Sequence, residues 1–159
     1  MPDVSRREEF LGEWAKAAAT VRLTRRGDLT INETKQDTGI DFHVQIDRED
    51  KSMRLIFGVL LRAVPSPVTA EHANQVLRPT MGQFLGMRKF TYPVCLFFLT
   101  MREDQAFFSW LAEPILADES PKLVHHVRPD CIPMTDGFLD HAIERIVAWY
   151  DAVEALLIA

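Results

Sequence analysis

The stretch from residue 37 to residue 64 constrains the fold more than any other part of the chain. Because successive strand side chains point to opposite faces, strict alternation of polar and apolar residues predicts a half-buried strand. The first half of the stretch alternates in this way, with Asp41, His43, Gln45 and Asp47 between Ile40, Phe42, Val44 and Ile46. The second half, residues 53–64, is apolar apart from two arginines, which is typical of a central strand covered on both faces. We therefore expect two neighbouring strands joined by a charged turn, with any chemistry lying on them.

The rest of the chain supplies helices and strands in an order that predicts an α/β fold. Apolar spacing and turn residues predict one domain over residues 1–159, with a mixed central β-sheet flanked by helices. Pro79 should break or kink the helical stretch in which it occurs. The predicted helices span about 5–21, 70–77, 81–89 and the region after Thr135 or Asp136, and the predicted further strands span 29–33, 93–101, 105–111 and 122–131.

Composition indicates an ordinary globular chain. Of its 159 residues, 47% are hydrophobic and 26% are charged. No window approaches the roughly 18 apolar residues of a membrane helix, and the first residues do not resemble a signal peptide. Cys95 and Cys131 lie in apolar runs, which favours buried free thiols. These features predict a cytoplasmic protein with no membrane partner.

The net charge of −5 is unevenly distributed along the chain. Residues 51–102 contain seven Lys or Arg and one acidic residue, whereas residues 103–159 contain three basic and eleven acidic residues. This excludes a wholly basic nucleic-acid binder but leaves room for a basic face from the middle of the chain. Two interpretations remain open, a nucleic-acid surface and an uneven scatter of surface charges.

Five segments, taken in order, resemble a known family. They are DTGID at residues 37–41, Leu60-Leu61-Arg62, PVCLFFLTM at 93–101, FFSWLAEP at 107–114 and the closing CIPMTDGFLDHAIERIVAWYDAV at 131–153. The series resembles a small bacterial restriction-endonuclease-like family (PD-(D/E)XK, Mrr-like) of unknown function, and it covers the chain from about Ser5 onward. The resemblance implies a restriction-endonuclease-like fold. It also implies a site where the strand-opening Asp and the first residue of the second motif hold Mg²⁺, beside a Lys that positions the attacking water.

This chain departs from the family at the second motif. Hard cations need oxygen ligands, and the second ligand position is Leu60, which has none. The lysine position is Arg62, a permanent cation that cannot act as a base. Asp41 alone is retained, so a metal would need Asp37, Gln45 or Asp47 to be recruited. The sequence therefore predicts a divalent-metal site that has been eroded.

Three functions are compatible with these residues. The first expectation is a pseudo-nuclease that binds nucleic acid or regulates a partner in a bacterial defence setting, with DNA held by Arg25, Arg26, Arg62, Arg88 and Lys89. The second is an active Mg²⁺-dependent DNA endonuclease whose rearranged catalytic set is Asp41, Gln45 and Arg62, with Asp41 and Asp37 as metal ligands. The third is a protein-interaction module that forms a homodimer or binds a partner protein. A turn at Arg25 and Arg26 that meets no partner is as compatible with the sequence as a phosphate contact.

Overall fold

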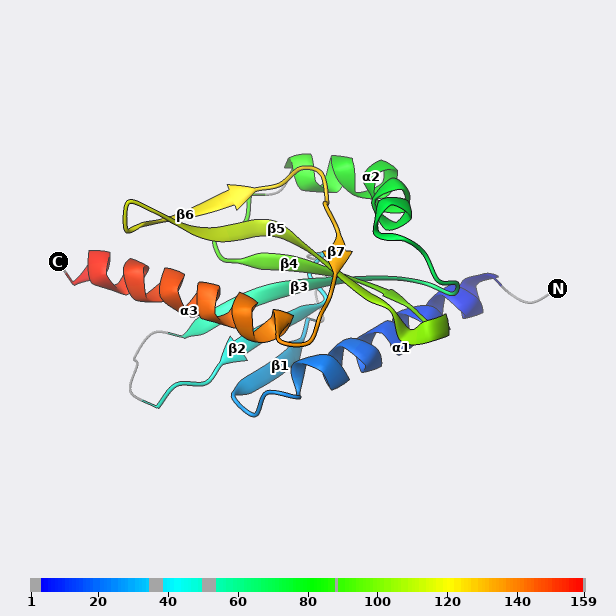
Figure 1. Cartoon of the computed structure of the whole chain (residues 1–159), viewed down its shortest axis with the longest axis horizontal. Coiled ribbons are helices and arrows are strands. Elements are labelled where there is room, and N and C mark those ends of the chain that lie inside the picture. The colour runs from blue at the N-terminus through cyan, green and yellow to red at the C-terminus, as the bar shows by residue number, and fades with distance from the viewer. Residues whose placement is uncertain (1–3, 35–38, 50–53, 88, 159) are drawn as a thin grey trace.

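The computed structural model describes residues 4–34, 39–49, 54–87 and 89–158, and Figure 1 shows its elements. Of residues 4, 5, 80 and 82–87 it describes the backbone alone. The helices are α1 (Val4–Leu23), α2 (Ala70–Met87) and α3 (Phe138–Leu157), with a short 3₁₀ turn η1 (Arg102–Asp104). The strands are β1 (Leu29–Glu33), β2 (Phe42–Ile46), β3 (Leu55–Val64), β4 (Val94–Thr100), β5 (Ala106–Ala117), β6 (Ser120–His125) and β7 (Ile132–Pro133).

The described strands form one mixed sheet in the order β1-β2-β3-β4-β5-β6, and β7 pairs with part of β5. β1, β2 and β3 form an antiparallel meander, and β4, β5 and β6 form a second one. β3 and β4 are parallel, with Gly58 beside Val94 and Val64 beside Thr100. Parallel neighbours need a crossover connection, and α2 supplies it. The expected mixed α/β sheet flanked by helices is confirmed.

α1 and α3 cover the same face of the sheet. Residues at alternate positions of β2, β3 and β4, including Val44, Phe57 and Phe97, are buried there. Ala15, Ala19 and Leu23 line the inner side of α1, where small residues let the helix lie close to β3. α3 contributes Ile143, Ile146, Trp149 and Tyr150 and packs on β5 and β6.

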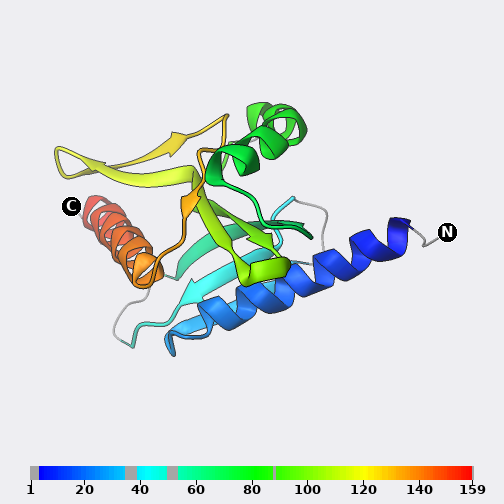
Figure 2. The same ribbon diagram turned by 45° about the vertical axis from the view of Figure 1, so that its right-hand side comes forward.

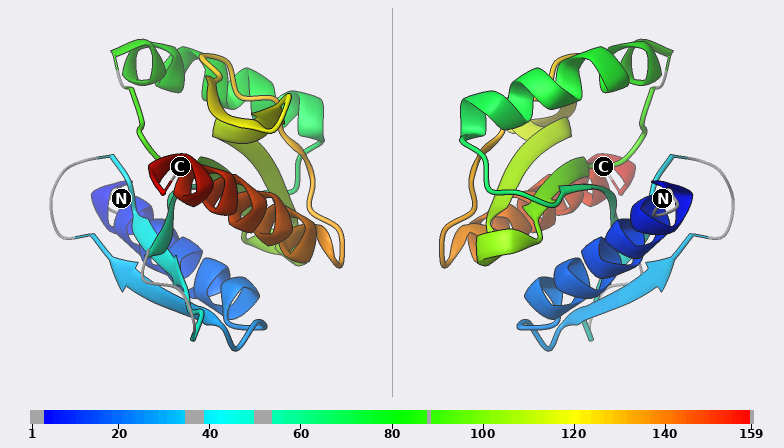
Figure 3. Two further views of the ribbon diagram at one scale, coloured as in Figure 1. Left: turned by 90° about the vertical axis from the view of Figure 1, so that its left-hand side faces the viewer. Right: turned by 90° about the vertical axis from the view of Figure 1, so that its right-hand side faces the viewer.

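α2 covers the opposite face with a separate core. Ala73, Leu77 and Met81 of α2 pack with Leu60, Leu96, Phe98, Phe107 and Leu111 of the central strands. Figures 2 and 3 show α2 apart from α1 and α3, on the other side of the sheet. The core residues on this face come mainly from β3, β4 and β5. The same face of β1 and β2 therefore has little cover, and Thr30 and Asn32 of β1 are exposed there.

Several expected boundaries changed. α2 runs through Pro79 as one helix, so of the predicted break or kink the break is wrong. Proline removes one hydrogen bond from a helix interior, but packing of Ala73, Leu77 and Met81 holds the helix together. β5 runs to Ala117, well past the expected end at residue 111. The expected strand over 122–131 is strand only as far as His125, at the end of β6, and β7 begins just beyond the expected range.

The turn between β5 and β6 has an unusual backbone for its sequence. Asp118 and Glu119 link the paired residues Ala117 and Ser120 in a two-residue hairpin. Both turn residues have positive φ, 51° and 65°, as a type I′ turn requires. Asn and Gly are the residues that tolerate this conformation best. As for a membrane span, none of the helices in the described ranges is both long and apolar enough to form one.

Candidate functional site

Asp41 lies where β2 begins, beside the middle of β3. Gly39 has φ of 80°, a left-handed conformation that glycine adopts without strain, and it turns the chain toward β2. The backbone of Asp41 is then fixed on both sides: its N–H donates to the carbonyl of Val59, and its carbonyl accepts from the N–H of Thr34, both at 3.0 Å. The side chain of Asp41 is about one-third exposed.

The carboxylate of Asp41 is occupied by a backbone contact. Its Oδ2 accepts a hydrogen bond from the N–H of Leu61 at 2.7 Å. The backbone pairing of β2 with β3 ends at Phe42 and Val59, so this side chain satisfies a donor that lies just beyond the ladder. Asp41 therefore has a structural task of its own.

Arg62 brings a positive charge to the same carboxylate. Its Nη1 lies 4.0 Å from Asp41 Oδ2 and donates to the carbonyl of Leu61 at 2.8 Å. The Arg62 side chain is 43% exposed, so it remains open to solvent as well as to Asp41. The guanidinium thus partly neutralises the carboxylate where a metal ion would have to bind.

Leu60, the residue beside Asp41 on β3, is buried hydrocarbon. Extending the β2–β3 register by one residue sets Asp41 beside Leu60. Leu60 is fully buried in the core under α2, together with Ile40, Leu77 and Met81. This position belongs to the packing of the domain, since no exposed surface there could accept a ligand.

The described residues around Asp41 do not fit a divalent cation. Such an ion takes six or more oxygen ligands. Here one carboxylate is bound to a backbone N–H, its neighbour is Leu60, and a guanidinium lies 4.0 Å away. Within the described ranges, moreover, no three His, Cys, Asp or Glu side chains converge as a metal group.

The other predicted ligands lie elsewhere or outside the described residues. Gln45 Nε2 donates to Asp47 Oδ1 at 3.4 Å, and Asp47 Oδ2 accepts from the Thr30 hydroxyl at 2.8 Å. These contacts hold Gln45 and Asp47 toward β1 and away from Asp41. Asp37 falls outside the described part of the chain.

A histidine–tyrosine pair lies on the same sheet face, two residues along β2 from Asp41. His43 Nε2 and Tyr92 Oη are 2.9 Å apart, and the rings meet edge to face at 5.7 Å between centroids. Burial raises the pKa of Tyr92, which keeps the phenol protonated at neutral pH. The pair can therefore hydrogen-bond a ligand, but the phenol is no nucleophile.

Gly58 makes room for the ring of Tyr92. A Cβ built at Gly58 would lie 3.3 Å from side-chain carbons of Tyr92, Ile40 and Val94. A glycine within a strand commonly marks such a close approach. This signal was present in the sequence, but the partner of the glycine, 34 residues further on, was not visible without the fold.

The five predicted nucleic-acid contacts do not share one face. Arg62 alternates with the buried Leu61 and so projects from the face covered by α2. Arg25 and Arg26 follow α1 and line a pocket with the start of α3, which covers the opposite face. Lys89 is exposed after α2, and Arg88 lies outside the described residues.

Comparison with family models, with curated proteins and with solved structures found no match to this chain. The fold itself defines an α/β domain built on a mixed seven-stranded sheet with helices packed against it.

Proposed function

We propose that this chain is a restriction-endonuclease-like pseudo-nuclease. It binds nucleic acid but does not carry out metal-dependent cleavage. The observation that carries the proposal is the contact between Arg62 and Asp41, 4.0 Å apart on neighbouring strands. The family resemblance requires these two motif positions to meet, and the register of β2 and β3 supports that requirement. The replacement of the family's second metal ligand by Leu60, and of its lysine by Arg62, supports the loss of metal-dependent cleavage.

The exposed polar face around Arg62 is the proposed contact surface. Arg62 and His43 lie on the sheet face that α2 covers, where Arg62 remains exposed, and Tyr92 packs beside the α2 core within hydrogen-bond distance of His43. Arginine binds phosphate oxygens through paired donors, and histidine and tyrosine rings can stack on unpaired bases or bond to them. Asp41 on this surface is engaged by the N–H of Leu61, which argues against its acting as a base beside a phosphate.

A cleavage assay tests the absence of metal-dependent chemistry. Purified protein and the Asp41→Asn variant would be incubated with plasmid and single-stranded DNA in Mg²⁺ and in Mn²⁺. We expect no cleavage by either protein and no metal-binding heat in calorimetry. Cleavage by the natural sequence that disappears in Asp41→Asn would overturn the proposal in favour of a rearranged active endonuclease.

A binding assay tests the nucleic-acid half of the proposal. We expect Arg62→Gln to weaken retention on single-stranded and duplex DNA and to reduce the slope of affinity against salt by about one. Arg6→Gln, an exposed arginine near the start of α1, is the matched control for a general change of charge. Equal DNA affinity in all three proteins, or no affinity at low salt, would leave a protein-interaction module as the better description.

A further inference from the structure

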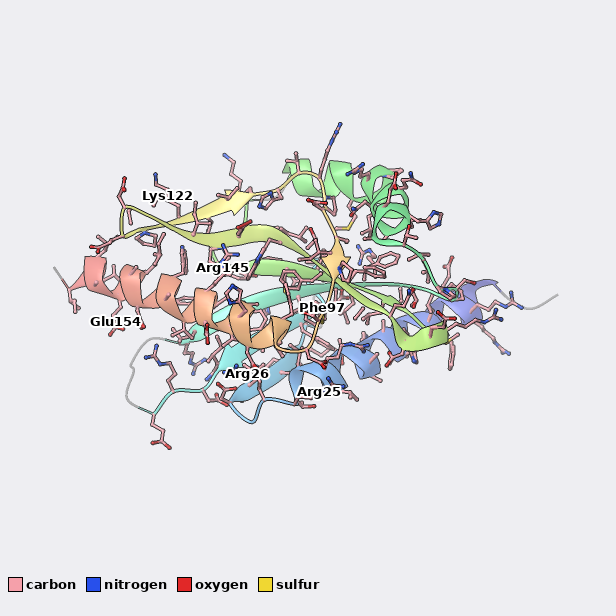
Figure 4. The ribbon with its side chains drawn as sticks, viewed as in Figure 1. Arg25, Arg26, Phe97, Lys122, Arg145 and Glu154 are labelled. Carbon is pink, nitrogen blue, oxygen red and sulfur yellow. The ribbon has the colours of Figure 1, made fainter. Side chains whose placement is uncertain are left out.

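A pocket between the end of α1 and the start of α3 has no part in the proposed function. It has a volume of about 760 Å³ and is bounded by the end of α1, the loop before α2, the β4–β5 turn and the start of α3. Protein sites for small organic ligands usually measure roughly 300–1,000 Å³. Figure 4 labels Arg25 and Arg26, where α1 gives way to β1, and Phe97 in the middle of the sheet.

We propose that this pocket binds a nucleotide-sized organic anion, with its oxyanion group between Arg22 and Arg25. Arg22 and Arg25 both line the pocket, as do the apolar residues Phe107, Met134 and Leu139. A pocket with cationic and apolar parts suits a ligand that has a phosphate or carboxylate at one end and a ring at the other.

Arg25 is the available cation of this pocket. Its side chain is exposed, and within the described ranges its guanidinium makes no hydrogen bond or ion pair. Arg26, by contrast, is fully engaged: it bonds to both carboxylate oxygens of Asp28 at 3.0 and 2.8 Å and to Asp140 at 2.6 Å. Arg26 therefore forms a fixed wall and leaves the binding of an anion to its neighbours.

Arg22 can exchange its present partner for a ligand. Its Nη2 bonds to Asp104 Oδ1 at 3.0 Å and to the Asp104 carbonyl at 3.1 Å. The Arg22 side chain is 17% exposed, whereas that of Asp104 is 70% exposed. An ion pair with so exposed a carboxylate is weak, and an incoming anion could displace it while the carbonyl keeps Arg22 in place.

The carboxylates that face the pocket set the expected affinity. Asp104 is paired with Arg22 and Asp140 with Arg26, while Asp136 lies exposed at the edge. These acids reduce the positive potential, so a single bare anion should bind less tightly than one that also fills the apolar part. Affinity should fall as ionic strength rises.

Calorimetry with adenosine monophosphate, inorganic phosphate and uncharged adenosine tests the proposal. We expect the nucleotide to bind more tightly than phosphate and adenosine to bind weakest. Arg25→Gln should weaken nucleotide binding by roughly tenfold, the loss of one charge-assisted hydrogen bond. Asp104→Asn should strengthen it by a few-fold, since the variant removes the competitor for Arg22.

Opposite effects of these two exposed substitutions cannot come from a general loss of structure. Asn also suits the left-handed backbone of Asp104, whose φ is 47°. Arg6→Gln, near the start of α1 and outside the pocket lining, is the control and should leave nucleotide affinity unchanged. The proposal fails if no probe binds at millimolar concentration, if phosphate binds as tightly as the nucleotide, or if Arg6→Gln reduces binding as much as Arg25→Gln. The DNA-binding test depends on Arg62 and the nucleotide-binding test on Arg25, so the two proposals can fail independently.

Discussion

At the scale of single residues, Asp41 shows how a retained motif residue can serve the fold. Its carboxylate accepts the Leu61 N–H at 2.7 Å, beyond the last paired residues of β2 and β3. Asp41→Ala leaves that half-buried donor unpaired and should cost about 1–3 kcal/mol of unfolding free energy. Asp41→Asn keeps an oxygen for the bond and should cost less than about 1 kcal/mol. Urea denaturation of both variants measures the difference.

Equal losses for the two Asp41 variants would show that the charge of Asp41, through Arg62, matters more than its hydrogen bond. This comparison is also the folding control for the cleavage assay, because Asp41→Asn must remain folded for that assay to be informative.

The β5–β6 turn offers a gain in stability at one residue. Glu119 has φ of 65°, and a non-glycine residue in this conformation costs roughly 1–2 kcal/mol. Glycine removes that strain at a smaller entropic cost, so Glu119→Gly should stabilise the protein by about 0.5–1 kcal/mol. A thermal melt is sufficient to detect the shift. Glu119→Ala, which keeps the Cβ, should give no comparable gain, and an equal gain would mean that the carboxylate was the destabilising group.

Residue chemistry could be predicted only where it did not depend on distant partners. The polar row of β2, the buried state of Cys95 and Cys131 and the missing oxygen ligand at Leu60 all followed from local pattern. The bond between His43 and Tyr92 and the use of the Asp41 carboxylate by Leu61 did not, because each joins segments that only the sheet brings together.

At the scale of helices and strands, apolar periodicity predicted which segments form helices and strands but not where some of them end. α1 and β1 lie within two residues of expectation, because helical and alternating patterns are clear there. β5 runs beyond its predicted end at residue 111 and includes Pro114, a residue that strands usually lack, which is buried opposite Leu123. The parallel pairing of β3 with β4 has no local signal at all.

Pro79 is a measurable defect of α2. It occurs inside the helix, where it cannot donate to the carbonyl four residues earlier, and its own side chain is exposed. Pro79→Ala should therefore restore one hydrogen bond and stabilise the protein by about 1–3 kcal/mol in urea denaturation. Arg78→Ala, the exposed neighbour, should change stability by less than about 0.5 kcal/mol. A destabilised Pro79→Ala would indicate that the bend itself positions α2 on its core.

At the scale of the whole molecule, an ion-pair cluster around one glutamate connects α3 to the β5–β6 hairpin. Glu113 of β5 accepts bonds from Arg145 of α3 and His126 after β6, both at 2.9 Å. Arg145 also lies over the ring of Trp110, 5.5 Å from its centroid. Burial opposes ionisation of Glu113, but the bonds from Arg145 and His126 outweigh it and lower its pKa from the usual 4.5.

Acid should therefore loosen this connection. A carboxyl whose folded pKa is lowered contributes stability above its unfolded pKa and loses it as pH falls through the folded value. We expect the natural sequence to lose stability below about pH 4.5, and Glu113→Gln to lose less over the same range while being less stable at neutral pH. Glu144→Gln, an exposed change on α3, should follow the natural profile. Parallel acid profiles for all three proteins would contradict this role of Glu113.

The pocket beside Arg25 belongs to the same scale, and sequence could not reveal it. Its walls come from the end of α1, the loop before α2, the β4–β5 turn and the start of α3. The sequence marked Arg25 and Arg26 as a basic turn, but only the packing of α1 and α3 on one face shows that this turn closes a cavity.

The parallel pairing of β3 with β4 also divides the chain into two halves that must find each other. Each antiparallel meander can form through short hairpins, whereas partners such as Gly58 and Val94 meet only after the crossover through α2 closes a long loop. α1 reaches across to β4 and α3 reaches back to β3, so the first and last helices each bind the other half. The docking of the halves is thus the expected slow step of folding. A chain nicked between the halves should therefore stay assembled through the β3–β4 pairing and the packing of α1 and α3.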